Sequence, residues 1–108
     1  MRIVQRLATG GGDELSKAIV MNEKDNVATA LCDISEGSRP VVIGFKSKQG
    51  VVVKSDIPFG HKFALSKVSE NEPIIKYGEV IGVSTTFIDA GDYVHVHNVE
   101  SLRGRGDQ

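Results

Sequence analysis

The sequence contains 108 residues, of which 40% are hydrophobic and 25% are charged, and this balance predicts one soluble globular domain with a single core. Its 13 basic and 14 acidic residues leave a formal net charge of −1, a field too weak to indicate nucleic acid or a membrane surface as the partner. No apolar stretch approaches the roughly 20 residues of a membrane span, and the start of the chain lacks the long apolar centre of a secretory signal. We therefore expect a cytoplasmic protein that binds a small polar ligand or another protein.

The amino-terminal part predicts a flexible lead-in followed by a strand. Residues 1–16 contain three consecutive glycines and few residues that can pack, which indicates a loose segment. The apolar run AlaIleValMet at 18–21 is a strand candidate. We expect the folded domain to occupy 17–102.

One short helix is expected after this strand. Val27, Ala28, Ala30, Leu31 and Ile34 recur at helical spacing. Asp25 or Asn26 would cap this helix and Gly37 would end it. Cys32, the single cysteine, cannot form an internal disulfide, and its apolar surroundings indicate a small core residue without a catalytic role.

The rest of the chain predicts short strands, so the fold class is mainly β. The strand candidates are 41–45, 51–53, 62–65, 74–77, 80–84 and 93–99. A weak internal echo begins at Ile34, Val68 and Ile88, where an apolar residue stands three places before a Gly or Asn able to adopt positive φ. This pattern predicts one turn type used three times. The polar residues 103–108 should form a tail or the start of a linker.

The first of three polar clusters is HisValHisAsn at 95–98. On a strand, alternate residues point to the same face, so His95 and His97 would lie on one side. Two imidazoles at this spacing are compatible with metal or substrate contact, and the alternative is a pair of exposed or hydrogen-bonded histidines.

The other two clusters follow a turn and close the chain. The turn ProPheGly precedes His61 and Lys62 and would aim this titratable pair at a ligand, although an ordinary surface strand can start in the same way. Arg103 and Arg105 carry paired donors that match a carboxylate or phosphate, and the alternative is a solvated tail.

Four motifs in the same order resemble the amino-terminal domain of altronate and galactarate dehydratases and the small subunit of sulfolactate sulfo-lyase. They cover nearly everything from 18 to 107. The motifs are AsnGluLysAspAsnValAlaThrAla, IleProPheGlyHisLysPheAla, IleLysTyrGlyGluValIleGly, and ValHisValHisAsnValGluSer followed by ArgGlyArgGlyAsp. The resemblance implies a β-clip domain of the SAF type, with short strands and one short helix.

The same resemblance implies a part in a lyase reaction. In such a reaction a proton next to a carboxylate is removed and a β-hydroxyl, or sulfite, departs. It implies iron or manganese in the assembled enzyme, although none is assigned to this chain alone. The expected partners are a large catalytic subunit or domain and a sugar-acid substrate, and homo-oligomers are compatible with both.

Site roles follow from the resemblance as expectations. The expected catalytic residues are His61 and Lys62, the substrate-binding residues are His95, Asn98, Arg103 and Arg105, and the metal ligand is His97. The alternative is a non-catalytic module that binds a sugar acid or docks the catalytic subunit. We expect the isolated chain to be inactive and His61 to lie near the HisValHis pair.

Overall fold

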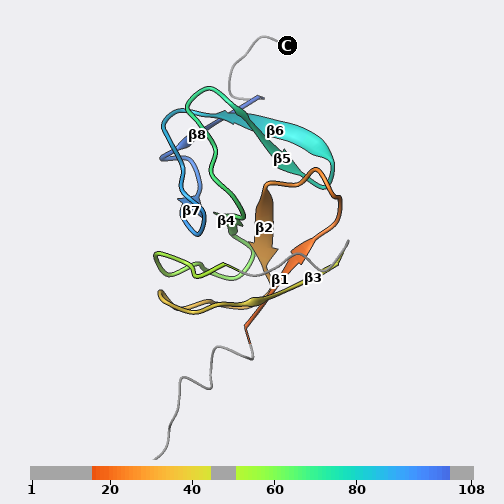
Figure 1. Cartoon of the computed structure of the whole chain (residues 1–108), viewed down its shortest axis with the longest axis vertical. Helices are drawn as coiled ribbons and strands as arrows, with labels where there is room; N and C mark the ends of the chain where they lie inside the picture. The colour runs from red at the N-terminus through yellow and green to blue at the C-terminus, as the bar shows by residue number, and fades with distance from the viewer. Residues whose placement is uncertain (1–15, 45–50, 103–108) are drawn as a thin grey trace, which may run out of the picture.

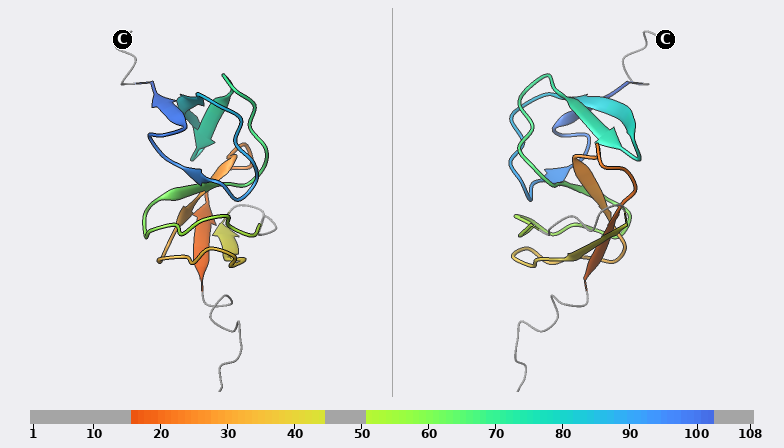
Figure 2. Two further views of the ribbon diagram at one scale, coloured as in Figure 1. Left: turned by 90° about the vertical axis from the view of Figure 1, so that its left-hand side faces the viewer. Right: turned by 45° about the vertical axis from the view of Figure 1, so that its right-hand side comes forward.

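The computed structural model describes residues 16–44 and 51–102, and these residues form two β-sheets. The first has five strands in the order β3-β1-β2-β4-β7 and the second has three in the order β5-β6-β8. Figures 1 and 2 show the three-stranded sheet above the five-stranded one. The strands are β1 (Lys17–Val20), β2 (Val27–Ala30), β3 (Val41–Gly44), β4 (Lys62–Ala64), β5 (Pro73–Lys76), β6 (Glu79–Ser84), β7 (Tyr93–Val94) and β8 (Val99–Ser101).

The strands pair mostly with antiparallel neighbours, and among residues 16–44 and 51–102 only β1 and β3 run parallel. The five-stranded sheet contributes residues to both of two apolar clusters, and the three-stranded sheet contributes Ile74 of β5 to the smaller one. The larger cluster surrounds the fully buried ring of Phe63. The smaller cluster is built around Val27, Ile74 and Ile88. The mainly β class is confirmed, because strands and turns account for all regular structure in the described residues.

The predicted helix at 27–34 is wrong. Val27–Ala30 is strand β2, which lies between β1 and β4. The two faces of β2 enter different clusters, Val27 one and Ala28 with Ala30 the other. A short strand buried on both faces carries apolar residues that are nearly continuous, and this pattern cannot be told from a helical one by spacing alone.

Asp25 and Asn26, the predicted helix caps, instead connect the two sheets. The buried Asp25 carboxylate accepts hydrogen bonds from the backbone N–H groups of Met21, Asn22 and Gly78. The Asn26 side chain accepts from the N–H of Ile75 in β5 and donates to the carbonyl of Pro73. These side chains therefore fix the loop before β2 against the β5–β6 hairpin.

The predicted turn occurs at all three expected places and at a fourth. We define turn segments 34–37, 57–60, 68–71 and 88–91. Each ends in a residue with positive φ, with values of 89° at Gly37, 84° at Gly60, 71° at Asn71 and 91° at Gly91. The segments form two pairs, which we call the first pair (34–37 with 57–60) and the second pair (68–71 with 88–91). Each pair is joined by an antiparallel bridge, Ile34 to Ile57 and Val68 to Ile88.

The backbone hydrogen bonds of the two pairs match one another. In the first pair, the N–H of Gly37 donates to the carbonyl of Val53, and that of Gly60 donates to Ala30. In the second pair, Asn71 donates to Ser84 and Gly91 to Ala64. In each case the N–H of the positive-φ residue donates to the carbonyl of the residue that stands four positions before the partner segment. The two pairs of turns are therefore equivalent in their backbone hydrogen bonding.

Most strand predictions hold within one or two residues, and two do not. Residues 51–53 form no named strand, although Val53 is fully buried and its N–H donates to the carbonyl of Ser38. The predicted strand 93–99 is interrupted by a turn over 95–98 between β7 and β8. The predicted lead-in lies outside the described residues except for Ser16, which is buried and accepts from the N–H of Val41. The predicted tail 103–108 also lies outside them.

Candidate functional site

His61 directly follows its turn, and the residues at this position in the second pair of turns accept a hydrogen bond that stabilises the turn. The residues that directly follow turn segments 57–60, 68–71 and 88–91 are His61, Glu72 and Asp92. Glu72 and Asp92 each accept a hydrogen bond from the backbone N–H three residues earlier, in Ser69 and Asp89. Three residues before His61 stands Pro58, which has no N–H to donate. The first pair therefore has no use for a carboxylate at position 61, and its side chain is available for another contact.

That contact is a cluster of four rings, which we call the histidine cluster: His61, Tyr93, His95 and His97. The centroids of the His61 and His95 rings lie 4.9 Å apart. Tyr93 stacks on His95 with an interplanar angle of 5° and a centroid distance of 5.5 Å, and its ring is 5.6 Å from that of His97. The expected proximity of His61 to the HisValHis pair is thus confirmed, and Tyr93 stands among all three imidazoles.

The HisValHis pair is not on a strand, so the predicted alternation is wrong. The N–H of Asn98 donates to the carbonyl of His95, which closes a turn. Asn98 is buried, its side-chain oxygen accepts from the N–H of His95, and its side-chain nitrogen donates to the carbonyl of Tyr93. The amide predicted to bind substrate is therefore used to hold the turn.

The turn separates two open hollows of the surface. The first hollow, of about 300 Å³, is lined among others by Lys62, Ile81, Val94, His95, Val96 and Val99. The second hollow, of about 350 Å³, is lined among others by Lys54, Phe87, Asp92, Tyr93, His97 and Asn98. His95 and His97 thus face different spaces. Lys62 shares the more apolar one with His95.

The charges in the first hollow are shifted toward neutral forms. Burial lowers the pKa of Lys62, and the nearby ammonium group of Lys76 lowers it further. Desolvation also lowers the pKa of His95, with smaller contributions from His61, Lys62 and His97. Near neutral pH His95 is consequently an uncharged imidazole, which is the form that accepts a proton or a hydrogen bond.

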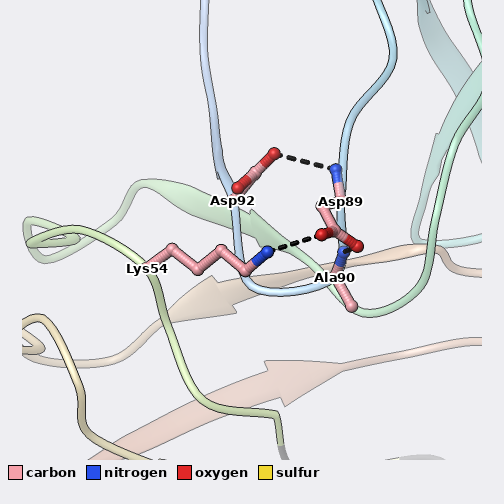
Figure 3. A network of polar contacts seen from close by, with 4 residues as sticks. All are labelled: Lys54, Asp89, Ala90 and Asp92. Atoms are coloured by element: carbon pink, nitrogen blue, oxygen red, sulfur yellow. Dashed lines mark hydrogen bonds and ion pairs between the residues drawn. The ribbon is translucent and has the colours of Figure 1, made fainter.

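The wall of the second hollow is tied together by polar contacts. Figure 3 shows the ammonium group of Lys54 paired with the carboxylate of Asp89, which also accepts from the N–H of Ala90. The N–H of Lys54 donates to the carbonyl of Gly91. These bonds join the stretch that leads into turn segment 57–60 to turn segment 88–91.

A metal fits this donor set poorly. Within the two described stretches, no group of three or more His, Cys, Asp or Glu side chains converges well enough to hold a metal ion. Iron and manganese sites in proteins use several imidazole and carboxylate ligands together. His97, the predicted metal ligand, is exposed and shares the second hollow with Asp92, whose Oδ2 atom already accepts from Asp89. Any complete metal site would need ligands from elsewhere.

Sequence reasoning missed Tyr93, although it found the histidines around it. A tyrosine at the start of a strand commonly packs against the core. Only the pairing of β7 with β4 brings Tyr93 close to His61. The signal in the sequence was its spacing of two from His95. Arg103 and Arg105 lie outside the described residues.

No helix long and apolar enough to cross a membrane occurs in the described part of the chain. Cys32 is partly buried against the larger apolar cluster, as expected for a small core residue.

Comparisons with known proteins agree with the resemblance seen in the motifs. Residues 16–102 match the profile of the altronate/galactarate dehydratase SAF domain. An altronate dehydratase from Bacillus subtilis is 41% identical over 83 residues, which are 77% of this chain and 16% of that protein. The altronate dehydratase of Escherichia coli is 40% identical over 90 residues, 83% of this chain and 17% of that protein.

A third relative is much shorter. The alpha subunit of (2R)-sulfolactate sulfo-lyase from Paracoccus pantotrophus is 38% identical over 63 residues, which are 58% of this chain and 94% of that subunit. This chain therefore spans about a sixth of the altronate dehydratases and nearly all of a separate small subunit. The chain belongs to the altronate/galactarate dehydratase SAF domain family.

Proposed function

We propose that this chain is the small subunit or amino-terminal domain of a sugar-acid dehydratase of the altronate/galactarate type. It supplies substrate contacts to a site that a large catalytic subunit or domain completes. Its family membership supports this assignment, because the relatives carry the same domain either within a longer dehydratase or as a separate alpha subunit.

The observation that carries the proposal is an incomplete polar site. Three imidazoles and Lys62 gather at open hollows, yet the described residues neither enclose a ligand nor assemble a metal site. Side chains that converge without a structural need are typical of a binding or catalytic site. The missing walls and ligands belong, in this proposal, to the catalytic partner.

The reaction class assigns roles to Lys62 and His95, which line the first hollow, and to His61, whose ring lies beside that of His95. A dehydratase removes a proton next to a carboxylate while a β-hydroxyl leaves. Lys62 and His61 bind and polarise the acid substrate, because an ammonium group and an imidazole N–H both donate to carboxylate oxygens. His95 contacts the substrate as a neutral imidazole. Asn98 orders the turn that holds His95 and His97, and iron or manganese, if the enzyme uses it, is held mainly by the partner.

The test uses the chain assembled with a large dehydratase subunit, with altronate and galactarate as substrates. Replacing His61 by Ala should lower kcat/KM roughly 100-fold, the effect typical of a lost polar catalytic group. Affinity for the large subunit should stay within twofold. The isolated chain should show no turnover, and turnover by the isolated chain or an unchanged rate in His61→Ala would refute the assignment.

A second candidate is a docking module without contact to the reacting atoms, and a specific observation favours it. The three most exposed large apolar side chains of the described residues are Val96 at 80%, Phe59 at 66% and Phe87 at 54%. All three belong to loops beside the histidine cluster. Replacing Val96 by Ser should weaken association with the large subunit while kcat at saturating subunit is retained, whereas a docking role for His61 predicts lost association in His61→Ala.

A further inference from the structure

The hydroxyl of Tyr93 is held against one particular nitrogen of His61. Its oxygen lies 2.5 Å from Nδ1 of that ring. Tyr93 pairs with Phe63 across β4 and β7, and its own carbonyl accepts from the side chain of Asn98. The sheet register and the turn therefore fix the backbone of Tyr93, while its partly buried ring packs against the larger apolar cluster and stacks on His95.

The chemistry of the two groups decides which of them donates. A phenol is a better hydrogen-bond donor than acceptor, because the ring withdraws electron density from its oxygen. An unprotonated imidazole nitrogen is a strong acceptor, and a neutral imidazole carries its proton on only one of its two nitrogens. A hydroxyl that donates to Nδ1 leaves the ring proton on Nε2.

We propose that Tyr93 is a positioning residue that holds His61 in the Nε2–H tautomer, so that His61 presents a hydrogen-bond donor to the carboxylate or hydroxyl oxygens of an acidic ligand. The identity of that ligand rests on the proposed function, whereas the tautomer does not. In this arrangement the N–H of His61 and the ammonium group of the adjacent Lys62 are both donors. A carboxylate, which only accepts hydrogen bonds, suits the donor that His61 presents.

Nitrogen-15 NMR of the histidine side chains in the isolated chain tests the tautomer directly. In the wild-type chain at a pH where His61 is neutral, Nε2 should appear as the protonated nitrogen and Nδ1 as a hydrogen-bonded acceptor. In Tyr93→Phe, which keeps the ring and removes the hydroxyl, the ratio of the Nε2–H to the Nδ1–H tautomer should fall roughly two- to tenfold, the effect of one net hydrogen bond on an equilibrium.

The matched control is Tyr77→Phe, since the sequence has only two tyrosines and Tyr77 is exposed in the β5–β6 turn. This change should leave the His61 tautomer unaltered. A wild-type ring protonated on Nδ1 would overturn the proposal without any variant. An unchanged tautomer ratio in a folded Tyr93→Phe chain would overturn it as well.

Turnover in the assembled enzyme separates this inference from the proposed function. Glutamine places its side-chain N–H close to the position of Nε2–H, so His61→Gln should retain at least tenfold more kcat/KM on altronate or galactarate than His61→Ala. Equal losses in the two variants would remove the donor role. If His61→Ala itself kept full turnover, the proposed function would fail, while the NMR result would still decide the role of Tyr93.

Discussion

The two pairs of turns have the same pattern of backbone hydrogen bonds, but different side chains cap them. In the first pair, Asp33 accepts from the N–H of Phe59 and Asp56 accepts from that of Glu36, so each segment caps the other. In the second pair, the corresponding residues are Lys67 and Phe87, which carry no carboxylate. There each turn is capped by the carboxylate that directly follows it, Glu72 or Asp92. The reciprocal backbone bonds are common to both pairs.

This difference shows which parts of the clip are free to change. The two kinds of cap serve different N–H groups: Asp33 and Asp56 accept from the third residue of the opposite turn, whereas Glu72 and Asp92 accept from the second residue of the turn they follow. In 57–60 the second residue is Pro58, which has no N–H, so the position behind this turn can hold a histidine. The candidate site thus includes His61, whose side chain does not cap its turn, unlike the equivalent Glu72 and Asp92.

The largest expected effect comes from the positive-φ glycines. A Cβ at Gly91 would lie 2.2 Å from the carbonyl oxygen of Val52, whereas a Cβ at Gly60 would meet nothing within 4 Å. Gly91→Ala should therefore lower the free energy of unfolding by about 3 kcal/mol or more, and Gly60→Ala by about 1 kcal/mol from backbone strain alone. Urea unfolding of both variants measures this. Equal losses would show that the close approach of Gly91 to the backbone of Val52 does not limit the side chain at position 91.

The next effect tests whether His61 can be returned to a structural role. The double variant Pro58→Ala with His61→Asp recreates the N–H and the carboxylate found at Asp89 and Asp92. Its free energy of unfolding should match that of the wild type within about 1 kcal/mol, while kcat/KM in the assembled enzyme falls roughly 100-fold. Single His61→Asp is the control, because Pro58 cannot donate to the new carboxylate. A double variant no more stable than this single variant would show that a carboxylate at position 61 cannot cap this turn.

Removing a carboxylate that caps the opposite turn should have a smaller effect on stability, and only the first pair has such carboxylates. Asp33→Ala leaves the N–H of Phe59 without its carboxylate and should cost about 1 kcal/mol of unfolding free energy, as loss of a comparable cap does in helices. Lys67→Ala, at the corresponding place in the second pair, should change the stability by less than about 0.5 kcal/mol. Chemical denaturation compares the two. A larger loss in Lys67→Ala would mean that the pairs are not capped as their hydrogen bonds indicate.

The smallest expected effect concerns the ion pair between Lys54 and Asp89. The hydrogen bond from Lys54 lowers the pKa of Asp89, and the N–H of Ala90 lowers it further. A carboxyl whose pKa is depressed in the folded state stabilises the fold above its unfolded pKa of about 3.9, and this contribution is lost as the pH falls through the folded value. The urea midpoints of the wild type and Asp89→Asn should differ slightly at pH 7 and converge toward pH 3. A difference that grows on acidification would contradict this linkage.

The sequence by itself determined features that depend on local chemistry. Positive φ at Gly37, Asn71 and Gly91 follows from the small set of residues that tolerate this conformation. The start of β4 at Lys62, two residues after Gly60 of the ProPheGly turn, follows from the same preferences. The motifs also identified the family, because four short matches in a conserved order are specific even where each one is weak.

Only the tertiary structure decided what depends on burial and strand pairing. Residues 27–30 form a strand because β1 and β4 flank them and both faces are buried, and spacing cannot report which neighbours a segment will have. Tyr93 meets His61 through the register of β4 with β7, across 32 residues of sequence. His95 and His97 face different hollows because the buried amide of Asn98 closes a turn where alternation predicted a strand. Such contacts between distant segments are set by the packing of the whole domain, and local patterns carry no record of them.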